Sequence, residues 1–144
     1  ESDESQEAEL IARRVEEIGK EIGEVRMLGT GAAIPGKHRN VSSVLLDLNS
    51  RGCILLDCGE GTCGQIIRAY GEREAENVLS RIKLIWISHM HADHHLGLLH
   101  VLKRSARERK RSQSEVRPIV IVGPRALDRW LTAYSQFGER LFYI

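Results

Sequence analysis

The sequence has 144 residues, 42% of them hydrophobic and 28% charged, a composition typical of a single globular domain. Its 21 Lys and Arg residues nearly balance its 20 Asp and Glu residues, so the net charge of +1 does not by itself indicate a polyanionic partner. No apolar run approaches the roughly 20 residues that a membrane-spanning helix needs, which excludes a membrane protein of that kind.

The first 23 residues form an acidic segment with a helical pattern. Apolar residues recur at helical spacing from Ile11 to Ile22, and Gly23 follows where helices commonly end. We therefore expect an amphipathic helix over residues 6–22 within an acidic linker segment, residues 1–23. Two roles remain open for this helix: docking on the following domain or on a missing partner, or bridging solvent as a linker.

From residue 24 onward, short β-rich runs separated by glycine-rich turns replace the helical periodicity. Strands come first and then alternate with helices, which predicts an α/β domain whose mixed sheet is covered by helices on one face. The expected strands are 25–28, 41–48, 53–56, 84–87 and 119–122, with a last strand beginning at 141–144. The expected helices are 64–70, 74–82, 95–110 and 125–137.

Three cysteines, Cys53, Cys58 and Cys63, have spacings that match neither a zinc ribbon nor a disulfide framework. We expect free, partly buried thiols and a reducing, intracellular compartment. The chain starts at Glu1 with no signal or transit segment, so we expect an excerpt of a longer protein.

Residues 103–117 are dense in Lys and Arg, and we expect a basic loop there after a helix leaves the core. One interpretation is a solvated loop without a partner. The other is contact with nucleic-acid phosphates, because clustered cations release the counterions of a polyanion and so increase affinity.

A group of metal-ligating residue types directly follows the apolar strand that ends at Ile87. His89, His91, Asp93 and His94 supply four donors within six residues. A tight loop at a strand end can direct the His-x-His pair toward one cation and the Asp-His pair toward a second. Neutral imidazole and carboxylate are donors that zinc accepts. Without a metal, burying so many ionisable groups would cost several kcal/mol, on the order of the penalty for isolated buried charges.

Asp57 ends another apolar strand and precedes two glycines. Its carboxylate either orients a ligand histidine through that histidine's second nitrogen or caps the helix expected to begin near Thr62. Glu60 is an alternative source of negative charge at that helix. His95 and His100 lie on the helix after the metal-ligand group, where we expect packing or support rather than metal ligation.

The His-x-His-x-Asp-His pattern after a strand is the signature of the metallo-β-lactamase superfamily, which the sequence resembles at every fixed position. Three further stretches are similar to tRNase Z, the endoribonuclease that removes the 3′ trailer from precursor tRNA, and most of all to the catalytic carboxy-terminal half of its long form. They are Leu28-Gly29-Thr30-Gly31, the loop from Pro35 to Ser43 that fits P-x-K-x-R-N, and the stretch from Leu56 to Thr62.

The resemblance implies an α/β metallo-β-lactamase-like (αββα) fold, represented over residues 24–144 only by its first part. It further implies that His89 and His91 bind one zinc, while Asp93 and His94 bind the second zinc of the complete domain. Asp93 would also handle the proton of the attacking water. Lys37 and Arg39 would approach the RNA near the cleavage point.

The family's remaining ligands, two histidines and a bridging aspartate, belong to the later part of its domain, and no histidine follows His100 here. We therefore expect a zinc-dependent tRNA 3′-processing endoribonuclease whose segment is weak or inactive alone. The alternatives are a non-catalytic segment that binds RNA or a partner, and another hydrolase of this fold such as a thioester hydrolase. Lys37, Arg39 and the basic run count against a small neutral thioester.

The expected partners are precursor tRNA and the amino-terminal half of the same long protein, whose junction would contain the acidic helix. A symmetric homodimer is a further candidate, although no particular residue favours it. The resemblance implies work in the nucleus, the mitochondrion or both.

Overall fold

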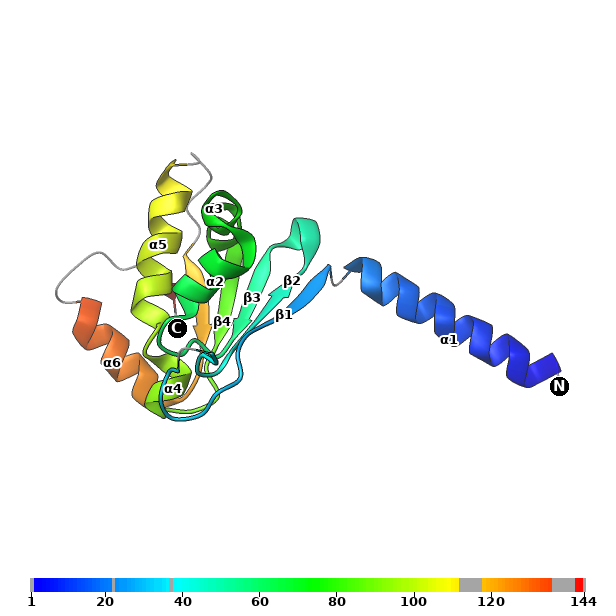
Figure 1. Cartoon of the computed structure of the whole chain (residues 1–144), viewed down its shortest axis with the longest axis horizontal. Coiled ribbons are helices and arrows are strands. Elements are labelled where there is room, and N and C mark those ends of the chain that lie inside the picture. The colour runs from blue at the N-terminus through cyan, green and yellow to red at the C-terminus, as the bar shows by residue number, and fades with distance from the viewer. Residues whose placement is uncertain (1, 22, 37, 112–117, 136–141, 144) are drawn as a thin grey trace.

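The computed structural model describes residues 2–21, 23–36, 38–111, 118–135 and 142–143 (Figure 1). One helix stands apart at the amino terminus, and a six-stranded sheet with packed helices follows it. Within this described part, no helix combines the length and the apolar character needed to cross a membrane.

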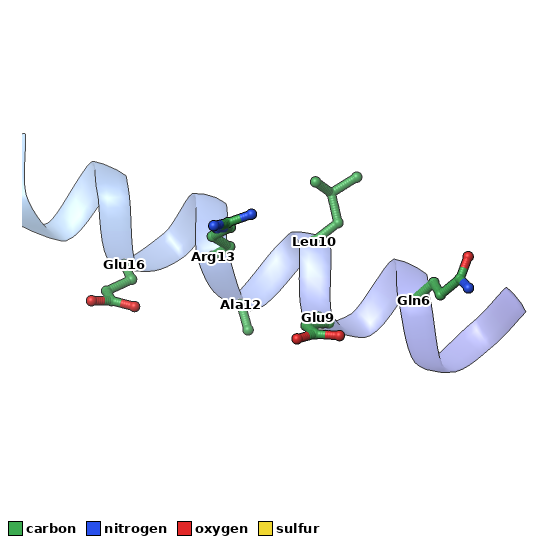
Figure 2. A pocket seen from close by; sticks show the side chains of 6 residues that line it. All are labelled: Gln6, Glu9, Leu10, Ala12, Arg13 and Glu16. Atoms are coloured by element: carbon green, nitrogen blue, oxygen red, sulfur yellow. The ribbon is translucent and has the colours of Figure 1, made fainter. Parts of the chain in front are cut away.

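The first helix, α1 (Ser2–Glu21), projects away from the sheet (Figure 1). It begins four residues before the predicted start, whereas predicted residue 22 lies outside the described residues. Leu10, Ile11 and Val15 are all exposed, so these apolar side chains do not dock on the described part of the following domain. Figure 2 shows a hollow along this helix, and all the residues that line it come from α1 itself.

The sheet is mixed, as the order of elements predicts. Its strands lie in chain order, with antiparallel pairing among the first three and parallel pairing among the last four. The strands are β1 (Glu24–Gly29), β2 (Ser43–Asp47), β3 (Cys53–Leu56), β4 (Ile82–Trp86), β5 (Ile119–Val122) and β6 (Phe142–Tyr143).

Helices cover one face of this sheet, which we call the inner face. Leu45, Leu55, Ile85 and Ile121 point from successive strands into this layer and are buried. The helices bury apolar residues spaced three or four apart, as an amphipathic helix requires. In the described part of the chain, a 3-10 helix, η1 (Asn49–Arg51), and five α-helices follow α1: α2 (Thr62–Tyr70), α3 (Glu72–Arg81), the short α4 (Ala92–His95), α5 (Leu98–Arg111) and α6 (Arg125–Ser135).

The opposite face, which we call the outer face, is also apolar. Strand registers place its members side by side, as in the row of Leu46, Ile54, Leu84 and Val120. Several of them are well exposed; Trp86, for example, exposes 42% of its surface. Runs of apolar residues without polar alternation are typical of strands buried on both faces. The outer face consists of Val25, Met27, Val44, Leu46, Ile54, Leu56, Leu84, Trp86, Val120 and Val122.

The predicted basic loop at 103–117 is wrong for its first part, because residues 103–111 belong to helix α5. Arg109 in this stretch is buried, and its guanidinium donates hydrogen bonds to the backbone carbonyls of Ser80 (2.9 Å) and Ile82 at the end of α3. A cation suits the carbonyls at a helix C-terminus. Burial lowers the pKa of Arg109. Residues 112–117 lie outside the described residues.

The three cysteines are free, as expected, and they are fully buried rather than partly buried. Burial raises the pKa of Cys53 to about 11 and that of Cys58 to about 12. Apolar surroundings disfavour the thiolate, so these side chains act as small core residues.

Candidate metal centre

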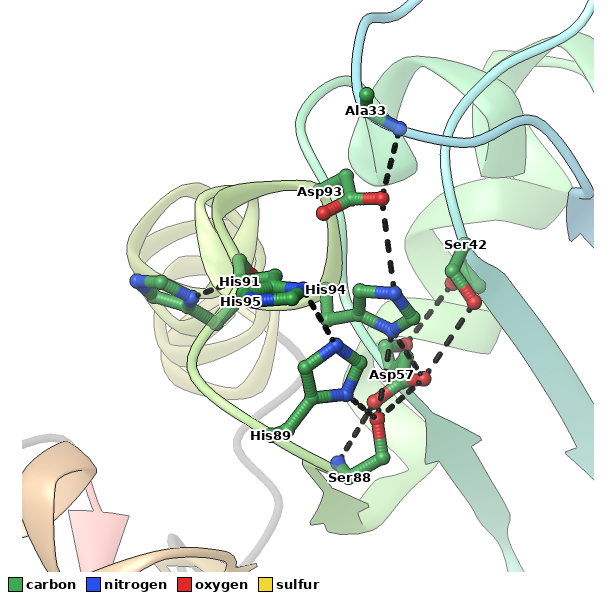
Figure 3. Close-up of polar contacts among 10 residues, drawn as sticks. Ala33, Ser42, Asp57, Ser88, His89, His91, Asp93, His94 and His95 are labelled. Carbon is green, nitrogen blue, oxygen red and sulfur yellow. Dashed lines mark hydrogen bonds and ion pairs between the residues drawn. The ribbon is translucent and has the colours of Figure 1, made fainter.

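A polar cluster lies at the carboxyl ends of β3 and β4, which are adjacent parallel strands (Figure 3). Asp57 directly follows β3, while the segment from Ser88 to His94, which ends in the short helix α4, follows β4. Parallel strands bring their carboxyl ends to the same edge of a sheet, where ligand sites commonly form in α/β folds. The Asp57 backbone N–H donates to the carbonyl of Trp86 at 2.7 Å and so joins the two strand ends.

Asp57 is buried, and its carboxylate contacts both Ser88 and His94. Its Oδ1 accepts the Ser88 backbone N–H at 2.8 Å, and its Oδ2 lies 2.7 Å from His94 Nδ1 and 3.0 Å from Ser88 Oγ. Burial raises the pKa of the Asp57 carboxyl, but the hydrogen bonds from Ser88 and His94 outweigh burial and hold this pKa below its usual value.

The alternative role for Asp57, capping the next helix, is wrong. Gly61 is the residue at the N-cap of α2, and the Asp57 carboxylate is bonded to Ser88 and His94 instead. Asp57 adopts a left-handed backbone conformation with φ 58°. Aspartate tolerates this conformation better than most residues, and here it turns the chain directly after the strand.

The predicted metal ligands come together as two pairs. His89 Nε2 lies 3.0 Å from His91 Nδ1, and His94 Nε2 lies 3.6 Å from Asp93 Oδ2. Two donors on one tetrahedral zinc are separated by about 3.3 Å, given bonds of about 2.0 Å, so each pair has a spacing that fits one ion. Across the described residues, no group of three or more His, Cys, Asp or Glu side chains is arranged to hold a metal.

Asp93 is oriented by a loop that precedes β2. The Ala33 backbone N–H donates to Asp93 Oδ2 at 2.8 Å (Figure 3). This hydrogen bond is the main cause that lowers the pKa of Asp93, and the positions of His94 and His91 act in the same direction. The carboxylate therefore carries its charge next to His94, as a metal ligand would.

Close backbone approaches hold the ligand loop against the turn after β3. A Cβ on Gly59 would lie 2.2 Å from the carbonyl oxygen of Asp93, and one on Gly97 would lie 2.1 Å from the carbonyl oxygen of Gly59. Cys58 N–H donates to the His94 carbonyl at 2.8 Å, while Gly97 N–H donates to the Cys58 carbonyl at 2.9 Å. Larger residues would push the two segments apart at both glycines.

The remaining histidines near the cluster have other surroundings. His95 is buried and packs edge-on against Trp130 with ring centroids 5.2 Å apart, and its Nδ1 bonds the His91 carbonyl at 3.0 Å. This agrees with the expected packing role. His100 is exposed on α5, and Glu60 is exposed at the turn before α2.

Of the two residues expected to approach RNA, only Arg39 lies in the described part of the chain. Arg39 is exposed, in the loop between β1 and β2 that also contains Ala33. Its carbonyl accepts the Gly36 N–H at 3.0 Å. Lys37 lies outside the described residues.

Three members of the cluster were not predicted from the sequence. Ser88 bridges Asp57 and His89, Ser42 Oγ lies 3.4 Å from Asp57 Oδ2, and Ala33 contributes its backbone N–H. Ser88 immediately precedes the histidine motif, so its position was an available signal. Nothing in the residue type of Ala33 indicates a backbone donor.

A mixed sheet with helices on one face, together with paired histidine and carboxylate donors after β4, defines a protein of the metallo-β-lactamase fold. The metallo-β-lactamase fold protein YhfI of Bacillus subtilis superposes with a TM-score of 0.59 at 16% identity, covering 76% of this chain and 41% of that one, which supports the fold alone. Residues 24–126 match the family model described as "Anti-Pycsar protein Apyc1", and the chain belongs to this family.

Curated relatives are similar over most of the chain. The mitochondrial tRNase Z TRZ3 of Arabidopsis thaliana is 47% identical over 130 residues, which are 90% of this chain and 14% of the relative. "Zinc phosphodiesterase ELAC protein 2" of Pan troglodytes is 43% identical over 122 residues, which are 84% of this chain and 15% of the relative. The chain therefore spans only about one seventh of these relatives.

Two solved structures of the same kind are also similar. The long form RNase Z from yeast has a TM-score of 0.71 at 33% identity and covers 81% of this chain and 16% of that one. The short form of human tRNase Z has a TM-score of 0.64 at 36% identity and covers 83% of this chain and 42% of that one. These similarities confirm the resemblance to tRNase Z over most of this chain.

Proposed function

We propose that this chain is the first part of the catalytic domain of a zinc-dependent endoribonuclease that removes the 3′ trailer of precursor tRNA. The observation that carries the proposal is the pairing of His89 with His91 and of Asp93 with His94 at one strand end. The names and identities of the relatives supply the substrate class. The expected products are a tRNA that ends in a 3′-hydroxyl and a trailer that begins with a 5′-phosphate, because the 3′ oxygen of the tRNA is the leaving group.

His89 and His91 would hold one zinc, and Asp93 and His94 the other, with the remaining ligands supplied by chain beyond this segment. When bound, such ions would lower the pKa of the attacking water and stabilise the charge on the oxygens of a phosphodiester. Asp57 keeps the ring of His94 in place through the 2.7 Å contact at Nδ1. This contact leaves the Nε2 atom of His94 facing Asp93.

Asp93 would serve both as ligand and as the group that takes the proton of the attacking water. Its Oδ2 is fixed by the Ala33 N–H, and the lowered pKa keeps the carboxylate charged at neutral pH. Lys37 and Arg39 would contact RNA phosphates from the adjoining loop. The exposure of Arg39 supports this role, because a guanidinium pairs well with phosphate.

Within the longer protein, residues 1–23 would act as the linker to an amino-terminal half, and residues 24–144 would begin the catalytic domain. The exposed outer face supports this division, since so many apolar side chains on one sheet face require a cover. Later parts of the same domain would supply that cover. Work in the mitochondrion follows the name of the Arabidopsis relative; work in the nucleus rests on the sequence resemblance.

One observation favours a second function for the isolated segment. No three donors converge among the described side chains, so the segment alone would bind zinc weakly and act as a non-catalytic RNA-binding or partner-binding piece. The catalytic and the non-catalytic proposal assume the same fold. They differ in whether the complete domain cleaves RNA or only binds it or a partner.

The deciding experiment compares the full-length protein with its His91→Ala, Asp93→Ala and His100→Ala variants on precursor tRNA and on a glutathione thioester. We expect release of the trailer by the parent and by His100→Ala, a loss of at least about 100-fold in the two site variants, and no thioester hydrolysis. His100 is the matched control because it is an exposed histidine of α5 outside the pairs. Thioester hydrolysis without RNA cleavage, or full activity of Asp93→Ala, would overturn the proposal.

A further inference from the structure

The hydroxyl of Ser88 lies between the Asp57 carboxylate and the ring of His89 (Figure 3). We propose that Ser88 is a positioning residue that transmits the orientation of Asp57 to His89, so that one buried carboxylate fixes the tautomers of one histidine in each donor pair. The inference rests on the proposed metal centre but not on the identity of the substrate.

The argument depends on which atom carries each proton. Ser88 Oγ lies 3.0 Å from Asp57 Oδ2 and 2.9 Å from His89 Nδ1. A charged carboxylate can only accept hydrogen bonds, and a hydroxyl has one proton to donate. If Ser88 donated to His89, two oxygen acceptors would face each other at 3.0 Å. The hydroxyl therefore donates to Asp57, and the Nδ1–H of His89 donates to the hydroxyl.

This assignment leaves Nε2 of His89 without a proton. That nitrogen is the one that lies 3.0 Å from His91 in the first donor pair. A histidine binds a metal through a bare nitrogen, and the hydrogen bond at its other nitrogen sets which one is bare. Ser88 thus selects the tautomer of His89 that can bind a metal on the side where its pair partner lies.

His94 is set directly by the same carboxylate, which lies closer to its Nδ1 than the Ser88 hydroxyl does at 3.3 Å. Its Nδ1 lies 2.7 Å from Asp57 Oδ2, so this nitrogen donates and Nε2 faces Asp93. The rings of His89 and His94 are neighbours, with centroids 4.0 Å apart. Asp57 consequently acts on one donor pair directly and on the other through Ser88.

The bridge is held in place from both sides. The Ser88 backbone N–H donates to Asp57 Oδ1 at 2.8 Å, so the same residue binds both carboxylate oxygens. Ser42 is a useful control residue for Ser88. Its hydroxyl lies near the same carboxylate oxygen, 3.4 Å from Asp57 Oδ2, but it forms no described hydrogen bond to a histidine. Among the residues that the structure describes, Ser88 alone connects the carboxylate to the first donor pair.

The test compares Ser88→Ala, Ser88→Thr and the control Ser42→Ala in the full-length protein, with zinc affinity measured by competition against a chromophoric chelator. We expect Ser88→Ala to weaken zinc binding by about 10- to 100-fold, the usual effect of losing a partner of a ligand histidine. Ser88→Thr keeps the hydroxyl and should rescue affinity to within about threefold of the parent. Ser42→Ala should match the parent.

A second readout separates positioning from a general loss of structure. In the metal-free 144-residue chain labelled with ¹⁵N-histidine, long-range ¹H–¹⁵N NMR should show His89 protonated on Nδ1 in the parent and in Ser88→Thr. In Ser88→Ala the signal should shift toward the other tautomer while His94 keeps its proton on Nδ1.

Unchanged zinc affinity in Ser88→Ala, an equal loss in Ser42→Ala, or an unchanged His89 tautomer would each overturn the inference. Neither readout involves RNA. If the parent binds zinc with the predicted dependence on Ser88 but does not cleave precursor tRNA, the proposed function fails and the role of Ser88 stands.

Discussion

The two faces of the sheet are alike in sequence and unlike in structure. On the inner face, Leu45 and Leu55 are fully buried under the helices, whereas on the outer face Trp86 and Val122 expose 42% and 45% of their surfaces. Residues of the two faces alternate along each strand, as Leu45 and Leu46 do in β2 and Ile85 and Trp86 do in β4. The apolar runs of the strands therefore indicate that both faces of the sheet require burial. The helices in the described part of the chain cover the inner face and leave the outer face open.

The difference matters for the metal centre because the cluster lies at the end of this sheet. Asp57 and Ser88 follow β3 and β4, whose inner sides are anchored by packed helices. The inner face therefore fixes the strand ends that carry the cluster. The outer face contributes apolar surface without comparable packing in the described part of the chain.

The difference in burial between the two sheet faces can be tested most directly at two adjacent leucines of β2. Leu45 is fully buried on the inner face, and Leu46 is half-buried on the outer face. Leu45→Ala should lower the free energy of unfolding by about 2–5 kcal/mol, since it removes packed methyl groups and leaves a cavity. Leu46→Ala should cost about 1 kcal/mol, because less apolar surface returns to water. Urea unfolding of the 144-residue chain measures both.

The identical chemical change at the two positions is the control for this experiment. Equal losses at Leu45 and Leu46 would mean that the outer face is covered in solution, and the contrast between the faces would then be wrong.

The second prediction concerns the thiols beneath the helices. Cys53 and Cys58, with pKa values raised by burial to about 11 and about 12 from an ordinary 9.0, should alkylate with iodoacetamide at pH 8.5 at least about 100-fold more slowly in the folded chain than in urea. A Val122→Cys variant places a thiol on the exposed outer face and should react at the rate of a free thiol. Mass spectrometry of the labelled peptides gives each rate.

The same thiols give stability a defined pH dependence. Burial raises the pKa of these thiols in the folded state above the unfolded value of 9.0. Below pH 9 the thiols are protonated in both states, so their contribution to the stability of the folded state is fully present. Between pH 9 and about 11, the unfolded thiols ionise while Cys53 and Cys58 stay protonated, so their contribution to stability is lost. Rapid labelling of the native cysteines at pH 8.5 would contradict this account.

Much of the fold could be predicted from local pattern. The strands 53–56 and 119–122 match the structure at both ends, because apolar β-branched runs bounded by turns are strong local signals. The helix expected over 95–110 corresponds to α5, whereas the basic loop expected from residue 103 is wrong as far as residue 111. The burial of Arg109 could not be predicted from local charge, since it depends on carbonyls at the end of α3 that lie far away in sequence.

Some residues of the candidate metal centre could be predicted from the sequence motif alone, whereas other contacts depend on the tertiary fold. His89 and His91 lie in the loop after β4, and Asp93 and His94 lie in the short helix α4 that follows it. Their spacing within this one short segment already predicted two pairs. The contact of Asp57 with Ser88 depends on the parallel pairing of β3 and β4, which is a long-range feature. The position of Ser88 next to His89 is a local signal for its contact with that histidine, but its contact with the Asp57 carboxylate follows from the long-range strand pairing.

The smallest expected effect on stability tests the outer face alone. Val120 and Val122 both point outward from β5 and are exposed, so the double change Val120→Thr, Val122→Thr keeps shape and adds two hydroxyls that water can reach. The free energy of unfolding should change by less than about 0.5 kcal/mol per site, as for ordinary surface substitutions. Binding of the dye ANS, which reports exposed apolar surface, should fall in the same variant. A loss of several kcal/mol, or unchanged ANS binding, would mean that these valines are packed like the inner face rather than left open to solvent.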